Sequence, residues 1–234
     1  KPNTVIGGAT YALQQYGGNI AGMLWKSKGD GEKRKYDYSY DAANRLLGAD
    51  FNQYTGGSFN KTANVDFSVK MGDGINTHTA YDANGNILSM QQKGLKLNSS
   101  PTIDQLTYSY LDNSNKLKGV VDAANDNQST LGDFKYDGGT KGAIDYGYDV
   151  NGNLVSDANK KITSIQYNHL NLPQTITVAG KGTIQYTYDA GGNKLKKVTT
   201  DNTVNPVKIT TTLYLGGVVY ENDVLKFIGH EEGR

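Results

Sequence analysis

The sequence predicts an all-β protein built from repeated β-hairpins, and three observations predict it. Glycine and tyrosine are over-used, with 29 and 17 among 234 residues, whereas there are 4 prolines and 1 tryptophan. Turn-forming Gly, Asn and Asp alternate with the Tyr, Val, Ile and Thr that favour strands. A Tyr-x-Tyr-Asp-x-x-Gly-Asn motif also recurs, while no apolar stripe of helical spacing extends beyond two turns. We therefore expect many short strands and no helix.

The motif is followed by Leu or Ile within two residues. Five copies, some of them imperfect, lie at residues 38–46, 81–87, 108–117, 146–154 and 186–195. Phe134–Gly139 keeps only the strand half, and Tyr16–Ile20 keeps only the turn half. An internal repeat of this kind is a sign of a modular architecture.

The chemistry of the motif is that of a hairpin. Side chains alternate along a strand, so Ile144, Tyr146 and Tyr148 fall on one face. The Asn-Gly or Gly-Gly pair supplies the positive-φ residues of a tight turn, and the preceding Asp can bond the backbone two residues on. The following Leu or Ile opens the return strand.

Three further elements follow from pattern. Alternation predicts strands over 65–71 and 207–215, and Asn222-Asp223 divides a final hairpin between two apolar runs. Residues 122–133 are rich in Asp and Asn and are predicted to form a surface loop. Tyr148, Tyr167 and Tyr188 are 19 and 21 residues apart, which favours regular modules.

Composition excludes several classes of function. The formal net charge is +1 without a basic stripe, so we expect no nucleic acid and no anionic membrane surface as partner. No stretch is apolar enough for a membrane-spanning helix, and no signal peptide is visible after Lys1. The chain has no cysteine, which removes thiol chemistry and disulfides. A start without Met suggests a processed chain or a fragment of a larger protein.

No catalytic, cofactor-binding or metal-ligating residue is predicted. Asp82–Asn86 and Asp149–Asn153 begin like calcium loops but have Gly at the fourth position rather than the sixth, so hairpin turns are expected. The histidines His78, His169 and His230 show no metal-ligand spacing, and no nucleophile-elbow motif is present. Asp137–Gly142 lacks the spacing of a phosphate loop.

The tyrosines allow two interpretations. Stacked rings could form a sugar-binding platform, whereas a ladder of cross-strand aromatic pairs would hold the sheet together. Their fixed position in the repeat favours the ladder. Glycosylation sequons begin at Asn60, Asn98 and Asn127, but such matches are expected in a chain rich in Asn and Thr, and no function is assigned to them.

With these copies the chain resembles the YD-repeat, or RHS-repeat, family over residues 16–234. Gly22–Lys26 followed by Tyr36–Leu46 looks like the Bacteroidetes-type form, and Phe227–Arg234 looks like the stretch just before the RHS-associated core. The resemblance implies a β-sheet spiralling into a hollow shell, or part of one, with residues 1–234 as one shell segment. The self-cleaving site of some members would lie beyond Arg234, so no catalytic residue is carried over.

The resulting hypothesis is a structural shell segment that encloses or presents another polypeptide and has no chemistry of its own. Toxin cocoons and exported cell-surface proteins of the family have this role. We expect a secreted or cell-surface location, and a protein partner, the rest of a larger RHS polypeptide or an export assembly. The alternatives are an adhesion or carbohydrate-binding module and, last, a β-scaffold hydrolase with converging carboxylates.

Overall fold

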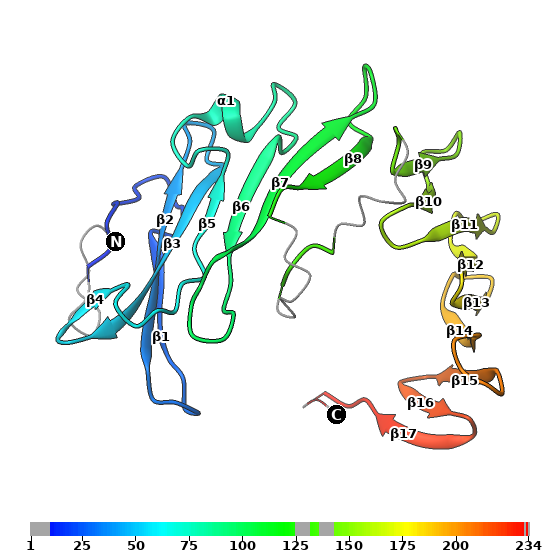
Figure 1. Ribbon diagram of the computed structural model, residues 1–234. Coiled ribbons are helices and arrows are strands. Elements are labelled where there is room, and N and C mark those ends of the chain that lie inside the picture. The colour runs from blue at the N-terminus through cyan, green and yellow to red at the C-terminus, as the bar shows by residue number, and fades with distance from the viewer. Residues whose placement is uncertain (1–9, 125–131, 136–142, 232, 234) are drawn as a thin grey trace. The chain divides into compact units, whose positions relative to one another are not determined.

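The computed structural model describes residues 10–124, 132–135, 143–231 and 233. Contacts divide the chain into two compact units, Lys1–Gly138 and Gly139–Arg234. Each unit contains one antiparallel β-sheet with neighbouring strands mostly in sequence order (Figure 1). The expected all-β fold made of hairpins is confirmed.

The N-terminal unit holds an eight-stranded sheet in the order β1-β2-β3-β5-β6-β7-β8, with β4 paired to the far end of β3. Its strands are β1 (Gly22–Lys26), β2 (Lys33–Tyr40), β3 (Leu46–Thr55), β4 (Ser58–Asn60), β5 (Val69–Met71), β6 (Ser89–Lys93), β7 (Thr102–Tyr110) and β8 (Leu117–Asp122).

One helical turn, α1 (Thr77–Ala80), lies between β5 and β6, where no helix was expected. The Asn76 side chain caps it by accepting a hydrogen bond from the His78 backbone N–H. Four residues are too few to give a recognisable helical period, so the sequence pattern could not reveal this turn.

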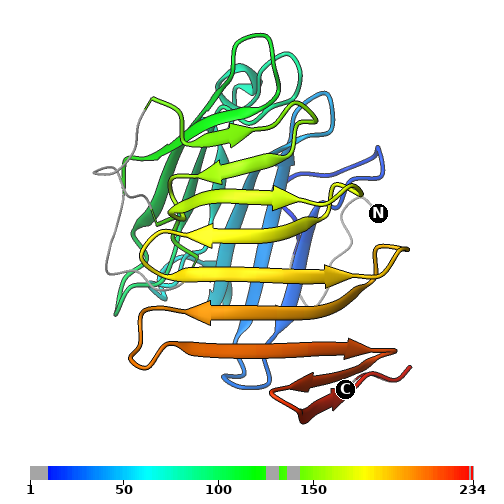
Figure 2. The same ribbon diagram turned by 90° about the vertical axis from the view of Figure 1, so that its right-hand side faces the viewer.

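The C-terminal unit is a nine-stranded meander running from β17 to β9, which faces the viewer in Figure 2. Every neighbouring pair is antiparallel and consecutive in sequence. Its strands are β9 (Tyr146–Tyr148), β10 (Leu154–Asp157), β11 (Ile162–Tyr167), β12 (Pro173–Val178), β13 (Gly182–Tyr188), β14 (Lys194–Asp201), β15 (Lys208–Leu215), β16 (Val218–Glu221) and β17 (Val224–Ile228). The strand predicted over 207–215 and the final hairpin at Asn222-Asp223 are thereby confirmed.

The turns of the Tyr-Asp copies differ from the expected ones in one respect. Only the second residue of each Asn-Gly or Gly-Gly pair has positive φ, as at Gly85 (φ 86°) and Gly152 (φ 87°). Gly85 N–H donates to Asp82 O, and Asp82 N–H donates to Asn86 O. This is a three-residue loop with a left-handed residue after a β-turn. Two consecutive positive-φ residues occur instead at Asn222-Asp223.

The strand predicted over 65–71 is shorter than expected, since β5 begins at Val69. Apart from Ser68 O, which accepts from the Lys93 N–H of β6, the backbone before β5 bonds mainly to side chains. Asp66 N–H donates to Ser100 Oγ, Phe67 O accepts from the Tyr36 hydroxyl, and Ser68 N–H donates to Asp66 Oδ1. Side chains that compete for backbone groups in this way end a strand.

Of the two incomplete copies, only Phe134–Gly139 was expected to contribute a strand. Phe134 and Lys135 are not in a strand, and the remaining residues of Phe134–Gly139 lie outside the described part of the chain. Tyr16–Ile20 forms a bend without a strand. In the loop predicted over 122–133, Asp122 is the last residue of β8, and 125–131 lie outside the described residues.

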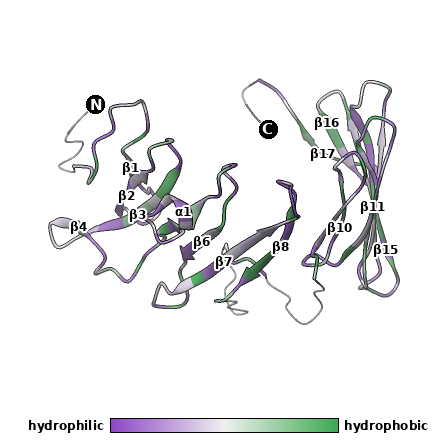
Figure 3. Ribbon diagram, turned by 90° about the horizontal axis from the view of Figure 1, so that it is seen from above, coloured by the Kyte–Doolittle hydropathy of each residue, from purple (hydrophilic) through white to green (hydrophobic). Residues whose placement is uncertain are grey.

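Apolar burial is concentrated in the N-terminal unit. Its cluster consists of Leu47, Met71, Ala80 and Tyr81, with partly buried side chains of Val69, Ile87 and Met90 against it. Among the described residues, the buried hydrophobic side chains all belong to this unit. In Figure 3 the strands of both sheets carry hydrophilic as well as hydrophobic stretches. Bonds between hairpins must therefore contribute much of the cohesion.

Substitution of Gly85 tests the turn geometry. A Cβ there would meet nothing closer than Arg45 Nη1 at 3.7 Å, so the cost of a side chain comes from φ alone. Asn44 takes the same left-handed position in another copy, at φ 62°. We expect Gly85→Val to lower the free energy of unfolding by about 1–2 kcal/mol and Gly85→Asn to lower it much less. Urea unfolding followed by the fluorescence of Trp25, the single tryptophan, measures both. Equal losses would contradict this geometry.

Candidate functional site

The candidate site is the repeated contact by which one hairpin holds the next. It begins with the Asx side chain of each turn. Asp41 Oδ1 accepts hydrogen bonds from the N–H groups of Ala43 and Arg45, at 2.9 and 2.8 Å. Asp82 and Asp189 do the same in their own turns, to the residues two and four positions on. The predicted bond to the backbone two residues on is confirmed, and a second one is added.

The other carboxylate oxygen explains the Asn that ends the motif. Asn86 Nδ2 donates to Asp82 Oδ2 at 2.8 Å, and Asn153 and Asn193 repeat the contact with their own aspartates. These bonds favour the ionised carboxylate. The hydrogen bond from the Asn86 side chain, followed by the turn's N–H groups, therefore lowers the pKa of Asp82 below its ordinary value.

In four of the five copies the second tyrosine reaches beyond its own hairpin, and Tyr167 does the same. In each case the hydroxyl donates to a backbone carbonyl earlier in the chain, at 2.6 to 2.9 Å. The donor–acceptor pairs are Tyr40 to Ile20 O, Tyr81 to Leu46 O, Tyr110 to Ile87 O, Tyr167 to Leu154 O and Tyr188 to Pro173 O. We call each of these bonds a tyrosine latch.

Ile20 lies before β1 and outside any strand, but the other four acceptors share one structural position. Leu46 is the register partner of Tyr40, and Ile87 is the partner of Tyr81. Pro173 likewise faces Tyr167. Each of these four latches therefore ends where the return strand of the preceding hairpin begins, opposite that hairpin's own tyrosine. The Leu or Ile that follows the motif opens the return strand and also offers this carbonyl.

A second contact reinforces the latch of Tyr81. Tyr81 is 8% exposed, and the Arg45 guanidinium lies 4.5 Å from its ring centroid. Arg45 Nε also donates to Asp41 Oδ2 at 2.8 Å. The turn of one hairpin thus covers the tyrosine of the next. Burial raises the pKa of Tyr81 above its ordinary value, so its hydroxyl stays protonated and able to donate.

Asparagine side chains join successive turns at their tips. Asn84 and Asn86 donate from Nδ2 to Asn115 Oδ1, at 3.0 and 2.9 Å. In the C-terminal unit, Asn151 and Asn153 donate in the same way to Asn171 Oδ1. The frequent Asn residues of the motif therefore bond between turns as well as within them.

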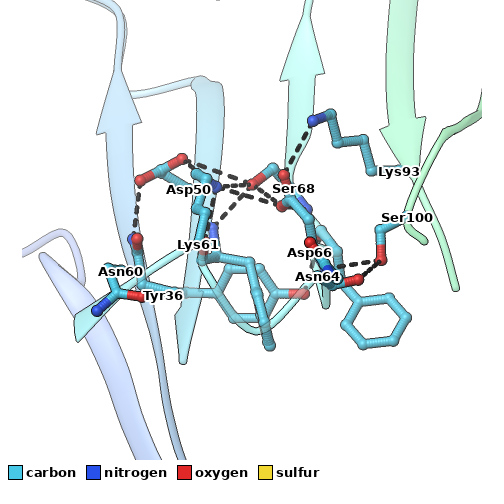
Figure 4. A network of polar contacts seen from close by, with 12 residues as sticks. Tyr36, Asp50, Asn60, Lys61, Asn64, Asp66, Ser68, Lys93 and Ser100 are labelled. Carbon is cyan, nitrogen blue, oxygen red and sulfur yellow. Dashed lines mark hydrogen bonds and ion pairs between the residues drawn. The ribbon is translucent and has the colours of Figure 1, made fainter. Parts of the chain in front are cut away.

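A separate polar network fixes the irregular segment before β5 (Figure 4). Lys61 Nζ lies 2.9 Å from Asp50 Oδ1 and 3.2 Å from Asp66 Oδ1, and Lys93 Nζ lies 3.0 Å from Asp66 Oδ2. Burial alone would raise the pKa of Asp66, but hydrogen bonds from Ser68 and Lys93 outweigh it and lower the pKa below its ordinary value. Asp66 is a paired structural anion.

The N-terminal unit has a cavity of about 260 Å³, and three carboxylates are among the groups that line it. Each of the three forms an ion pair or hydrogen bonds with a neighbouring group. Asp37 pairs with Lys35 at 2.8 Å, and Asp50 pairs with Lys61. Asp73 Oδ1 accepts the N–H groups of the turn that follows it. The cavity walls thus use these groups to hold neighbouring segments.

The candidates weighed from sequence belong to different elements. His78 belongs to α1, His169 lies in the β11–β12 turn, and His230 forms a bridge with Gly233 after β17. Asp82–Asn86 and Asp149–Asn153 are the hairpin turns that were expected. Asp137–Gly142 and the sequon at Asn127 lie outside the described residues. Asn60 Nδ2 donates to Thr55 O within the β3–β4 hairpin.

The spacing of the tyrosines included Tyr167, but the turn that follows it was missed by sequence reasoning. Asn168 accepts the N–H groups of Leu170 and Leu172, and Asn171 takes the left-handed position at φ 56°. Tyr167-Asn168 is therefore a Tyr-Asp turn with Asn replacing Asp and Asn replacing Gly. The signal was the six-residue interval from Tyr167 to Pro173, which equals that from Tyr148 to Leu154.

The repeat tyrosines favour the ladder interpretation in a modified form. Tyr36 and Phe51, which face each other across β2 and β3, pack edge-on at 5.4 Å between ring centroids. Tyr186 and Tyr188 are neighbours along one strand. The recurrent bond, however, runs from hydroxyl to backbone rather than from ring to ring.

No family model and no curated protein matches the sequence. Several solved structures are similar at low identity, among them three that contain TcdB2-TccC3. The TcdB2-TccC3-TEV structure is matched over 90% of this chain at 12% identity with a TM-score of 0.33. The TcdB2-TccC3 and TcdB2-TccC3-Cdc42 structures are each matched over 85% at 15% identity, with TM-scores of 0.37 and 0.36. The chain spans 12% of the length of each of these chains, and likenesses of this strength decide nothing about function.

Within the described part of the chain, no helix has the length and apolar character that crossing a bilayer would require.

Removal of one latch hydroxyl tests its contribution. Tyr81→Phe keeps the ring against Arg45 but leaves the Leu46 carbonyl without its donor. We expect the free energy of unfolding of the N-terminal unit to fall by about 1 kcal/mol, measured by Trp25 fluorescence in urea. The matched control is Tyr54→Phe, at a more exposed tyrosine that packs on Phe59, which should change stability little. Indistinguishable effects of the two variants would show that the latch contributes nothing.

Proposed function

We propose that this chain is a structural segment of a YD-repeat shell that encloses or presents another polypeptide. The observation that carries the proposal is the series of tyrosine latches. The carbonyl of one hairpin accepts a hydrogen bond from the tyrosine of the next, so the same contact can be repeated as hairpins are added in series. Such modules gain stability from neighbours rather than from a core of their own.

The outer strand β17 supports extension of the sheet. All five of its residues are exposed, including Val224 at 59% and Ile228 at 53%. Among the described strands only β16 pairs with it. An exposed apolar edge strand offers a template for pairing with another strand. In the proposed shell, that strand belongs to the rest of a larger RHS polypeptide or to a protein partner.

The proposal assigns no chemistry to the chain itself. It is supported by the structural interactions of the polar groups. The carboxylates of the cavity form ion pairs with lysines or accept hydrogen bonds from turn N–H groups, and the repeat aspartates accept hydrogen bonds within their own turns. The cargo is a polypeptide, as in the toxin cocoons and exported surface proteins of the family that the sequence resembles. A secreted or cell-surface location belongs to the same proposal.

Charged substitution of the edge tests extension through β17. Sedimentation velocity of the full chain over a concentration series should show reversible self-association through this edge. Val224→Lys combined with Ile228→Lys should abolish it, because charges on an edge strand oppose strand pairing. Leu195→Lys is the matched control, since Leu195 is 38% exposed but lies on the interior strand β14.

Two results would count against the proposal. One is a monodisperse monomer at every concentration, and the other is association that survives the edge substitutions. A monomer that also binds a glycan array would instead favour the carbohydrate-binding alternative.

A further inference from the structure

Three carboxylates of the N-terminal unit, two from the paired strands β7 and β8 and one from the segment after them, lie close together. Asp104 lies in β7, Asp122 ends β8, and Asp133 lies 11 residues after Asp122. One carboxylate oxygen from each lies within 4.8 Å of the others. Two oxygens bound to the same Ca²⁺ are at most about 5 Å apart, because each bond measures about 2.3–2.6 Å. The spacing therefore fits joint coordination of one such ion.

The cluster is buried. Asp104 is 2% exposed and Asp122 is 3% exposed, while the side chain of Asp133 is 1% exposed. Backbone groups fix two of the three. Asp104 Oδ1 accepts from Phe134 N–H at 2.7 Å, and Asp122 Oδ1 accepts from Gln105 N–H at 2.8 Å. The carboxylates are thus held in place rather than free to move into solvent.

The cluster concentrates negative charge. Lys135 pairs with Asp133 Oδ2. The carboxylates of Asp104 and Asp122 lie beside it in the same buried place. Carboxylates this close repel one another, and one divalent cation between them would offset that repulsion.

An independent observation points to a missing partner. Asp133 Oδ1 is buried and has no hydrogen-bond partner, although the other oxygen of the same carboxylate is engaged. A buried carboxylate oxygen without a donor is unfavourable unless something coordinates it. Asp66 shows the contrast in the same unit, because Lys61 and Lys93 occupy its two oxygens.

We propose that Asp104, Asp122 and Asp133 form a structural site for a calcium-type divalent cation. Carboxylate oxygens are the ligands that such a hard cation prefers, and Ca²⁺ tolerates the irregular geometry of a mixed site better than Mg²⁺ does. Water fills the remaining ligand positions. The ion fastens the segment around Asp133 to the β7–β8 hairpin and so closes the end of the N-terminal sheet.

Calorimetric titration of the metal-stripped full chain with CaCl₂ is the test. We expect one Ca²⁺ per chain, a rise in the melting temperature on adding Ca²⁺, and weaker binding of Mg²⁺. Asp104→Asn and Asp133→Asn should each weaken Ca²⁺ binding by about tenfold or more. Asp66→Asn is the matched control, a buried carboxylate neutralised by lysines, and should leave the affinity for Ca²⁺ unchanged.

Each outcome decides the proposal. Stoichiometric binding that is lost in the two cluster variants and retained in the control supports it. Absence of binding and of any melting shift in the wild-type chain overturns it and identifies the cluster as carboxyls sharing protons. Binding that survives both cluster substitutions overturns it as well, because the ion then lies elsewhere. The wild-type titration decides even where a variant fails to fold.

Discussion

A tyrosine hydroxyl that donates to the backbone of the preceding hairpin is the contact on which the rest of this structure depends. Most of the Tyr-Asp hairpins have their own Asx turn, but a two-stranded hairpin is marginal alone in water. The latch gives the hairpin a second tie, placed where its return strand begins. The bond requires a side chain as long as tyrosine with a donor at its tip, which explains why phenylalanine does not replace tyrosine at positions 81, 110, 167 and 188.

This contact accounts for a sheet that has little apolar core. Only 36% of the residues are hydrophobic, and the described C-terminal strands bury no large apolar side chain. The sheet is instead stabilised by backbone ladders, Asx turns, Asn–Asn bonds and latches, where other proteins rely on a packed apolar core. Since each tie joins near neighbours, hairpins can be added in series without redesign of the whole, which is the property that a shell segment needs.

Much of the fold could be predicted from the sequence, because hairpins are local. The strand alternation around Tyr146–Tyr148, the turn aspartates and the final hairpin at Asn222-Asp223 all follow from period and turn chemistry. The shortened β5 could not be predicted, because Ser100, far along the chain, competes for its backbone. The latches and the Asp104–Asp122–Asp133 cluster were also beyond reach, since sequence spacing does not specify which distant atoms meet.

Residue-resolved amide exchange of Tyr188→Phe tests most directly whether a tyrosine holds the hairpin before its own. The latch from Tyr188 ends on Pro173, so the account predicts faster exchange at the Asn168, Leu170 and Leu172 amides of the preceding turn. The amides that pair β14 with β15 should keep their protection, because no latch from Tyr188 reaches them. Faster exchange confined to the hairpin that contains Tyr188, with the Asn168–Leu172 turn unchanged, would contradict the account.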